Sequence, residues 1–221
     1  MRTTQKTVFF DIDGTLLYAK GCGRSAFANA FDDVFDMKID ISHINFAGAT
    51  DKGVIIQLLK EHDVSASEKS IKIFFERLAV HLEKNLHLFP PKLYPNVEHA
   101  LKEVTLDWNV ALITGNTYKC AHLKLKHAGI SHFFSDIGGY GDDNSCRKEI
   151  AKLALIRAGK PSYGILFGDT PNDILAAKAN NLVSVALCTG TFNKNQLMDY
   201  NPDHILESFK DIEELRTVLK V

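Results

Sequence analysis

Hydrophobic positions along the chain follow two spacings, one typical of strands and one typical of helices. The short, nearly continuous apolar run at residues 8–12 is the pattern of a strand buried on both faces of a parallel sheet. Further strands are predicted at residues 109–114, 135–137, 163–168, 183–187 and 204–206, of which 135–137 is the weakest. Helical spacing separates these strands, with helices predicted near 97–104, up to about Ala128, over 147–158, from Pro171, and over 209–219 after a cap at Ser208. The alternation predicts an α/β fold with a mostly parallel sheet.

Three consecutive helical patterns interrupt this alternation directly after the first strand. Apolar residues recur at helical spacing within 27–35, 54–59 and 71–82, and each segment has one apolar stripe and one polar face. We expect Asp51 and Ser67 to be the N-caps of the second and third helices. Three such stripes can bury one another, so these residues predict a small helical unit.

The helical unit has the character of an insertion. We expect it to span residues 18–89, with residues 1–17 and 90–221 forming the α/β core domain. The two connections, near residues 17–19 and at Pro90–Pro91, would lie close together. Two close linkers make a hinge geometrically easy.

Two carboxylates follow the first predicted strand. Side chains at i and i+2 of a strand point to the same side, so Asp11 and Asp13 converge at its carboxyl end, where Gly14 allows a sharp turn. Their mutual repulsion predicts a neighbouring cation, and a hard metal ion with oxygen ligands is the best candidate. The alternative interpretation is an ordinary Asp-Gly turn.

Three more polar groups stand at strand ends or helix starts, where open parallel sheets bind ligands. They are Thr114-Gly115-Asn116, the basic pair Arg147-Lys148, and the acids Asp169 and Asp173. Each could be a plain turn, cap or solvated helix start. Together they offer a hydroxyl, amide donors and a cation for phosphate, and carboxylates for Mg²⁺. An aspartate can act as nucleophile at pH 7 without deprotonation, because its usual pKa is about 3.9.

The pentapeptide Asp11-Ile12-Asp13-Gly14-Thr15 resembles the first motif of the haloacid dehalogenase superfamily in its phosphatase form. The other three groups match the remaining motifs in order, so the resemblance covers essentially the whole chain. It implies a Rossmann-like core with an inserted α-helical cap domain, as in the phosphoglycolate phosphatase and β-phosphoglucomutase-like branch. In that branch the cap closes over the site and helps to select the substrate. The segment 48–51 would then be either a cap loop facing the site or a plain helix cap.

The resemblance also implies catalytic roles. Asp11 would be the nucleophile and a Mg²⁺ ligand. Asp13 would be the general acid and base, with its backbone carbonyl also on the metal. Asp169 would be a further metal ligand, and Asp173 would support the metal, often through water.

The resemblance identifies one hydroxyl group and leaves two choices for the phosphate-binding cation. Thr114 matches the hydroxyl of the second motif, with Gly115 and Asn116 beside it. Either Arg147 or Lys148 would be the phosphate-binding cation. Arg147 is favoured because it stands directly before the helical pattern.

The implied activity is a Mg²⁺-dependent phosphatase that hydrolyses a small phosphorylated metabolite through an aspartyl-phosphate. A dehalogenase is disfavoured because Asp13 is present. A β-phosphoglucomutase-like phosphotransferase keeps both acids and stays open as an alternative. A non-catalytic ligand-binding protein of the same fold is expected to have lost Asp11, Asp13 or Asp169.

The composition and the spacing of residues argue against nucleic acid, a membrane and zinc as binding partners. The formal net charge of −1 gives no basic surface for nucleic acid, and no apolar run approaches the roughly 18 residues that span a bilayer. The first six residues lack the apolar core of a signal peptide. The four scattered cysteines fit reduced thiols in the cytoplasm. Nine histidines without H-x-H or H-E-x-x-H spacing are interpreted as surface or helix-face residues rather than zinc ligands.

Overall fold

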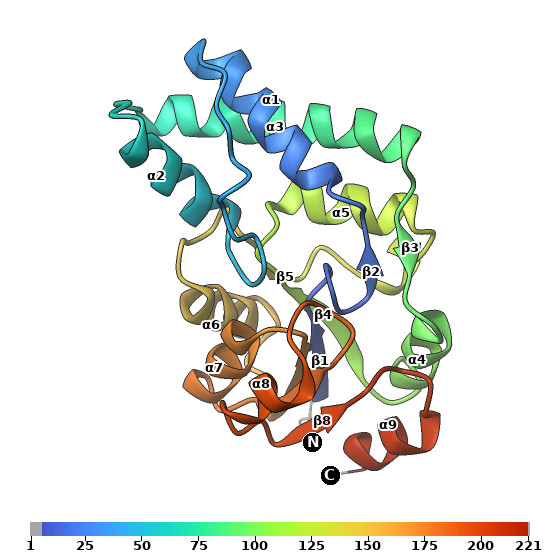
Figure 1. Ribbon diagram of the computed structural model, residues 1–221. Helices are drawn as coiled ribbons and strands as arrows, with labels where there is room; N and C mark the ends of the chain where they lie inside the picture. The colour runs from blue at the N-terminus through green and yellow to red at the C-terminus, as the bar shows by residue number, and fades with distance from the viewer. Residues whose placement is uncertain (1–5, 221) are drawn as a thin grey trace.

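A six-stranded parallel sheet lies at the centre of the computed structural model, which describes residues 6–220 (Figure 1). Its strand order is β5-β4-β1-β6-β7-β8, and every neighbouring pair is parallel. The strands are β1 (Lys6–Phe10), β4 (Asn109–Ile113), β5 (Gly138–Gly139), β6 (Tyr163–Gly168), β7 (Val183–Leu187) and β8 (His204–Leu206). The predicted α/β fold with a mostly parallel sheet is confirmed.

The central strand β1 explains the uninterrupted apolar run near the N-terminus. Phe10 pairs with Leu112 of β4 on one side and with Phe167 of β6 on the other. Phe9 points into the core on one face of the sheet, whereas Val8 and Phe10 point into the core on the other face. Both faces are buried, so the run from Val8 to Phe10 has no polar positions that alternate with the apolar ones.

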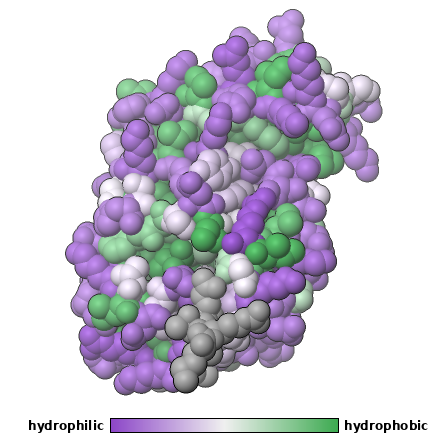
Figure 2. Space-filling view, turned by 180° about the vertical axis from the view of Figure 1, so that it is seen from behind, coloured by the Kyte–Doolittle hydropathy of each residue, from purple (hydrophilic) through white to green (hydrophobic). Residues whose placement is uncertain are grey.

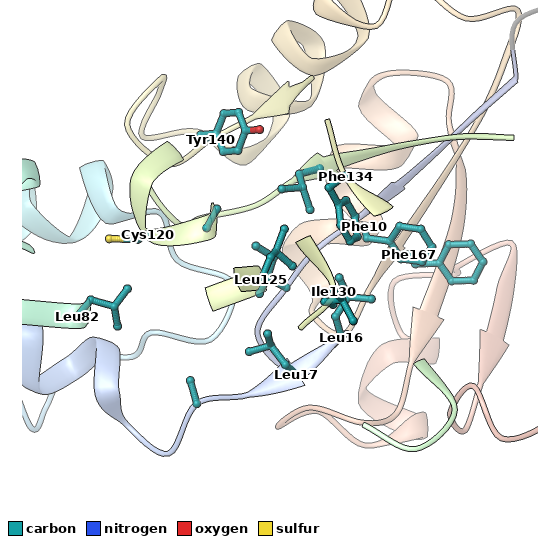
Figure 3. Close-up of a cluster of buried hydrophobic side chains, with 14 of the residues drawn as sticks. Phe10, Leu16, Leu17, Leu82, Cys120, Leu125, Ile130, Phe134, Tyr140 and Phe167 are labelled. Carbon is teal, nitrogen blue, oxygen red and sulfur yellow. The ribbon is translucent and has the colours of Figure 1, made fainter. Parts of the chain in front are cut away.

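Helices cover both faces of the sheet. The face containing Phe9 is covered by α6 (Arg147–Arg157) and α7 (Pro171–Ala179). The opposite face is covered by α4 (Val97–Val104), α5 (Tyr118–His127) and α9 (Ile212–Leu219). On that side Phe10 stacks on Phe167 with ring centroids 5.2 Å apart, within a cluster of buried side chains (Figure 3). Two short helices, η1 (Ser131–Phe133) and α8 (Lys194–Met198), complete this part of the chain.

The three predicted helices after β1 form a separate layer above the sheet (Figure 1). They are α1 (Cys22–Phe35), α2 (Asp51–Glu61) and α3 (Glu68–Leu88). Phe27 of α1 meets Phe74 of α3 edge-on, with ring centroids 4.8 Å apart, so the apolar stripes pack against one another as expected. We call residues 18–89 the helical insertion; its status as a separate cap domain with these boundaries stays a prediction.

The two connections of the helical insertion pair with each other. The strands β2 (Leu17–Tyr18) and β3 (Lys92–Leu93) form a short antiparallel ribbon. A further hydrogen bond of 3.0 Å runs from the Tyr94 backbone N–H to the Leu16 carbonyl. The connections therefore lie side by side, which is the geometry that a hinge requires.

Three local predictions are wrong. The weak strand at residues 135–137 lies instead at Gly138–Gly139, where β5 pairs with β4. Thr50, not Asp51, is the N-cap of α2, because its hydroxyl oxygen accepts from the Gly53 N–H at 3.0 Å. Asp211, not Ser208, caps α9 by accepting from the Glu214 N–H. The predicted cap of α3 at Ser67 is confirmed.

The surface of the molecule is mostly hydrophilic, with hydrophobic residues in separate patches when it is seen from behind (Figure 2). This follows from the amphipathic helices, whose polar faces point outward. Among residues 6–220, none of the helices combines the length and the apolar character needed to cross a bilayer.

The cluster of Phe10, Phe167 and Phe209 predicts how a core substitution affects stability. Phe167 is fully buried between Phe10 and Phe209. Phe167→Ala is expected to lower the free energy of unfolding by about 3–5 kcal/mol, because it removes apolar contacts and leaves a cavity. Urea denaturation measures this loss. Phe89→Ala, at a largely exposed position, is the control, and an equal loss in both variants would contradict the account.

Candidate active site

The carboxyl ends of β1, β4 and β6 bring the predicted site residues to one edge of the sheet. Asp11 and Asp13 follow β1, Thr114, Gly115 and Asn116 follow β4, Asp169 follows β6, Arg147 opens α6, and Asp173 lies in the first turn of α7. Most of them line one cavity of about 500 Å³. Thr114 and Asp173 are buried and do not line this cavity. Lys148 is exposed and lies outside this cavity.

Arg147 links two of the buried carboxylates. Its Nη2 lies 2.8 Å from Asp11 Oδ1 and 2.6 Å from Asp173 Oδ1, and it also donates to the Ile113 carbonyl at 3.2 Å. All three charged side chains are almost completely inaccessible to solvent. Of the two predicted cations, the geometry therefore favours Arg147 over Lys148.

Asp169 completes the acidic cluster of Asp11 and Asp173. Its Oδ1 accepts a hydrogen bond from the Thr15 hydroxyl at 3.0 Å. Gly14 has φ of +84°, and a Cβ atom there would clash with the Asp169 carboxylate. The glycine of the first motif therefore serves both the sharp turn and the close packing of this acid.

The charges of this cluster do not balance. Burial raises the pKa of Asp11 to about 6; Arg147 opposes the rise and Asp173 adds to it. Burial, together with Asp11 and Asp173, raises the pKa of Asp169 well above its usual value. Burial alone would lower the pKa of Arg147, but the two carboxylates raise it and keep the guanidinium charged. With one guanidinium for three buried carboxylates, a further positive charge would stabilise the cluster.

These residues fit a hard divalent cation. Asp11, Asp169 and Asp173 each offer one carboxylate oxygen, and these atoms lie within 4.8 Å of one another. An all-oxygen donor set is the kind that Mg²⁺ prefers. Both oxygens of Asp173 already have partners, since Oδ1 meets Arg147 and Oδ2 accepts from Thr170 at the start of α7. Asp11 and Asp169 are therefore the better direct ligands, and Asp173 the better support.

The Asp13 carboxylate has partners of its own, separate from the acidic cluster. Its Oδ2 accepts from Lys124 Nζ at 2.5 Å and from Asn116 Nδ2 at 2.8 Å. Lys124 Nζ also donates to Asn116 Oδ1 at 2.7 Å, and Asn116 donates to the Thr114 hydroxyl. The carboxylate of Asp13 is thus not a member of the metal-ligand cluster, and only its backbone carbonyl stays a predicted ligand.

Lys124 is the site residue that sequence reasoning missed. It lies on α5 with only 5% of its surface exposed, in the same apolar stripe as Cys120, Ala121 and Leu125. A lysine within the apolar stripe of an amphipathic helix is a detectable signal, because lysine is almost never fully buried unless it is paired. The pairing partner, Asp13, is far away in sequence.

The start of α2 docks onto the loop after β4. The Asp51 backbone N–H donates to the Gly115 carbonyl at 2.8 Å, and the Asp51 carboxylate accepts from the Thr117 N–H at 2.7 Å. Gly115 is required here, because a Cβ atom at this position would clash with the Ala49 carbonyl. Burial raises the pKa of Asp51 to about 7. The helical insertion therefore contacts the phosphate-binding loop predicted at residues 114–116 directly.

A family model described as haloacid dehalogenase-like hydrolase matches residues 5–181. The chain belongs to this family. It is 24% identical to the pyrophosphatase PpaX of Oceanobacillus iheyensis over 94% of each chain, and 27% identical to a phosphoglycolate phosphatase of Vibrio cholerae over 95% of this chain and 96% of that one. Its fold resembles that of a predicted phosphatase from Clostridium acetobutylicum, with a TM-score of 0.72, 20% identity, and coverage of 99% and 100% of the two chains. The prediction of a hydrolase of phosphatase type is confirmed.

The charge imbalance predicts how pH and divalent cations affect stability. The folded-state pKa of Asp11 is about 6 against 3.8 ordinarily, so its ionisation opposes folding increasingly as pH rises through this window. In EDTA at pH 7, Asp11→Asn is expected to be more stable than the wild type by about 3 kcal/mol, with the difference shrinking toward zero at pH 4. Urea denaturation at both pH values measures it.

A matched variant and added metal sharpen this test. Asp107→Asn, at an exposed position, is expected to show no such pH-dependent difference. Excess Mg²⁺ is expected to reduce or reverse the advantage of Asp11→Asn, because only the wild type keeps that ligand. A variant that is less stable than the wild type at pH 7 in EDTA would refute the imbalance.

The position of Lys124 predicts a kinetic effect. Lys124→Met removes one of the two donors that hold Asp13, so turnover of p-nitrophenyl phosphate is expected to fall. The loss should be smaller than the roughly 10²–10⁴-fold associated with removing a general acid–base group. Steady-state kinetics give kcat and KM. Lys126→Met, at an exposed position on the same helix, is the control; equal kinetics in both variants would exclude a positioning role for Lys124.

Proposed function

We propose that this protein is a Mg²⁺-dependent phosphatase that hydrolyses a small phosphorylated metabolite through an aspartyl-phosphate on Asp11. The observation that supports it best is the arrangement around Asp11. Arg147 pairs with Asp11, and Asp169 offers a carboxylate oxygen in the same cluster, while Asp13 is held separately by Asn116 and Lys124. The phosphatases among the chain's relatives agree with this class of reaction.

The first half-reaction would use Asp11 and Asp13 together. A carboxylate oxygen of Asp11 attacks phosphorus while the bond from phosphorus to the leaving oxygen breaks. Protonated Asp13 gives its proton to that leaving oxygen. Lys124 and Asn116 hold the Asp13 carboxyl group in place for this transfer. The products are the alcohol and an aspartyl-phosphate.

The second half-reaction would return the enzyme to its starting state. Ionised Asp13 takes a proton from a water molecule, which attacks phosphorus and breaks the bond to the Asp11 oxygen. Inorganic phosphate leaves, Asp11 is a carboxylate again, and Asp13 holds the proton for the next leaving group. Both steps therefore balance without any additional reactant.

Charge neutralisation would be shared among fixed groups. Arg147 is held beside Asp11 by Asp173, so its guanidinium is preorganised for the transferred phosphoryl group. The backbone N–H groups after Thr114 are further donors. Mg²⁺ bound to Asp11 and Asp169 would neutralise charge on the phosphoryl oxygens.

The cavity supports a small substrate. Its volume of about 500 Å³ lies in the range of small-molecule sites. The helical insertion contributes apolar side chains to it, among them Phe27, Phe46 and Leu82. We propose that the insertion acts as a cap, which excludes water during the first step and selects the leaving group.

A panel of phosphorylated compounds tests this proposal. Phosphoglycolate, sugar phosphates, nucleotides, pyridoxal phosphate and pyrophosphate are incubated with Mg²⁺ or with EDTA, and free phosphate is measured. We expect stoichiometric phosphate release from at least one compound, only with Mg²⁺. A β-phosphoglucomutase-like enzyme would convert its substrate with hardly any free phosphate, and a non-catalytic protein would convert none.

Two variants test the assigned roles. Asp11→Asn is expected to abolish turnover, because an amide cannot form the aspartyl-phosphate. Asp13→Asn is expected to reduce kcat by about 10²–10⁴-fold. Circular dichroism of both variants checks that the fold is retained. Wild-type turnover in either folded variant would defeat the assignment.

A further inference from the structure

A second cluster of metal-ligating side chains lies away from the carboxylate site, between the helical insertion and the α/β part of the chain. It consists of Glu83 and His87 on α3 and His127 at the end of α5. Their ligand atoms all lie within 4.8 Å of one another. The two helices pack side by side (Figure 1). Forty residues separate the two histidines, so the spacing of histidines in the sequence gave no sign of this cluster.

The local geometry suits shared coordination. Glu83 and His87 are four residues apart on one face of α3, and the rings of His87 and His127 have centroids 4.6 Å apart at an angle of 83°. His87 is exposed and His127 half-buried, so rotamer changes can bring the donor atoms closer without repacking the core.

The donor set indicates the class of ion. Two imidazole nitrogens and one carboxylate oxygen suit Zn²⁺ and similar transition-metal ions, whereas Mg²⁺ favours oxygen ligands alone. Three protein ligands leave a fourth position for water, as in open zinc sites. This cluster therefore differs in chemistry from the group formed by Asp11, Asp169 and Asp173.

We propose that Glu83, His87 and His127 bind a divalent transition-metal ion of the zinc type, which ties the helical insertion to the α/β part of the chain. His87 lies in the last turn of α3, close to the return connection at β3. An ion held there cross-links α3 to α5 beside the paired connections. Because an ion bound only to the folded protein stabilises it, metal binding raises the unfolding temperature.

The experiment measures metal binding directly, on the full-length protein in excess Mg²⁺. Zn²⁺ stoichiometry is determined by competition with a chromophoric chelator, and Co²⁺ is added separately to record visible absorption. We expect the wild type to bind one equivalent of Zn²⁺ more than His127→Ala and His87→Ala. We also expect four-coordinate Co²⁺ bands that both variants lose, and a Zn²⁺-dependent rise in Tm in the wild type alone.

The chain supplies a matched control. His99 on α4 pairs with Glu103, a carboxylate four residues away, at 3.6 Å, but among the described residues it belongs to neither of the two groups that could hold a metal ion. His99→Ala is expected to bind Zn²⁺ and Co²⁺ like the wild type. Equal stoichiometry in the wild type, His87→Ala and His127→Ala would overturn the proposal. If only one of His87→Ala and His127→Ala lost Zn²⁺ binding, the ion would not be shared by α3 and α5, and the proposed cross-link would be overturned.

Discussion

Burial of three neighbouring carboxylates is the constraint on which this site depends. Asp11, Asp169 and Asp173 are all inaccessible to solvent at the carboxyl edge of the sheet, with Arg147 as the cation between two of them. Water would stabilise a charged carboxylate better than the protein interior does, so the ionisation of Asp11 and Asp169 opposes folding. The negative charge of the cluster would be balanced if a further positive charge bound there during function. A hard divalent cation supplies that charge while the carboxylates stay ionised.

The same edge of the sheet determines how the helical insertion meets the chemistry. The Asp51 backbone can reach the loop after β4 because Gly115 has no side chain. A Cβ atom at Gly115 would clash with the neighbouring Ala49 carbonyl. The loop that was predicted to bind phosphate is therefore also the loop that the insertion contacts. Under the proposed function, closing of the insertion would be coupled to ordering of the phosphate-binding donors, as an enzyme that excludes water from a phosphorylated intermediate requires.

Much of this architecture could be predicted from sequence because its signals are local. The apolar run at β1 and the three amphipathic helices after it report burial directly, and the carboxyl ends of the strands locate Asp11 and Asp169. The pairing of Lys124 with Asp13 could not be predicted, since it depends on how α5 lies over β1. The short strand at Gly138–Gly139 could not be predicted, because two glycines have no side-chain pattern. Only the pairing with β4 defines this strand. The cluster of Glu83, His87 and His127 likewise exists only through the packing of α3 on α5.

The central claim is that Asp11 and Asp169 share a divalent cation. The most direct measurement is anomalous diffraction from crystals soaked with Mn²⁺ as a substitute for Mg²⁺. The account predicts an anomalous peak within coordination distance of carboxylate oxygens of both residues. Absence of a peak between them, at a Mn²⁺ concentration that supports turnover, would contradict it.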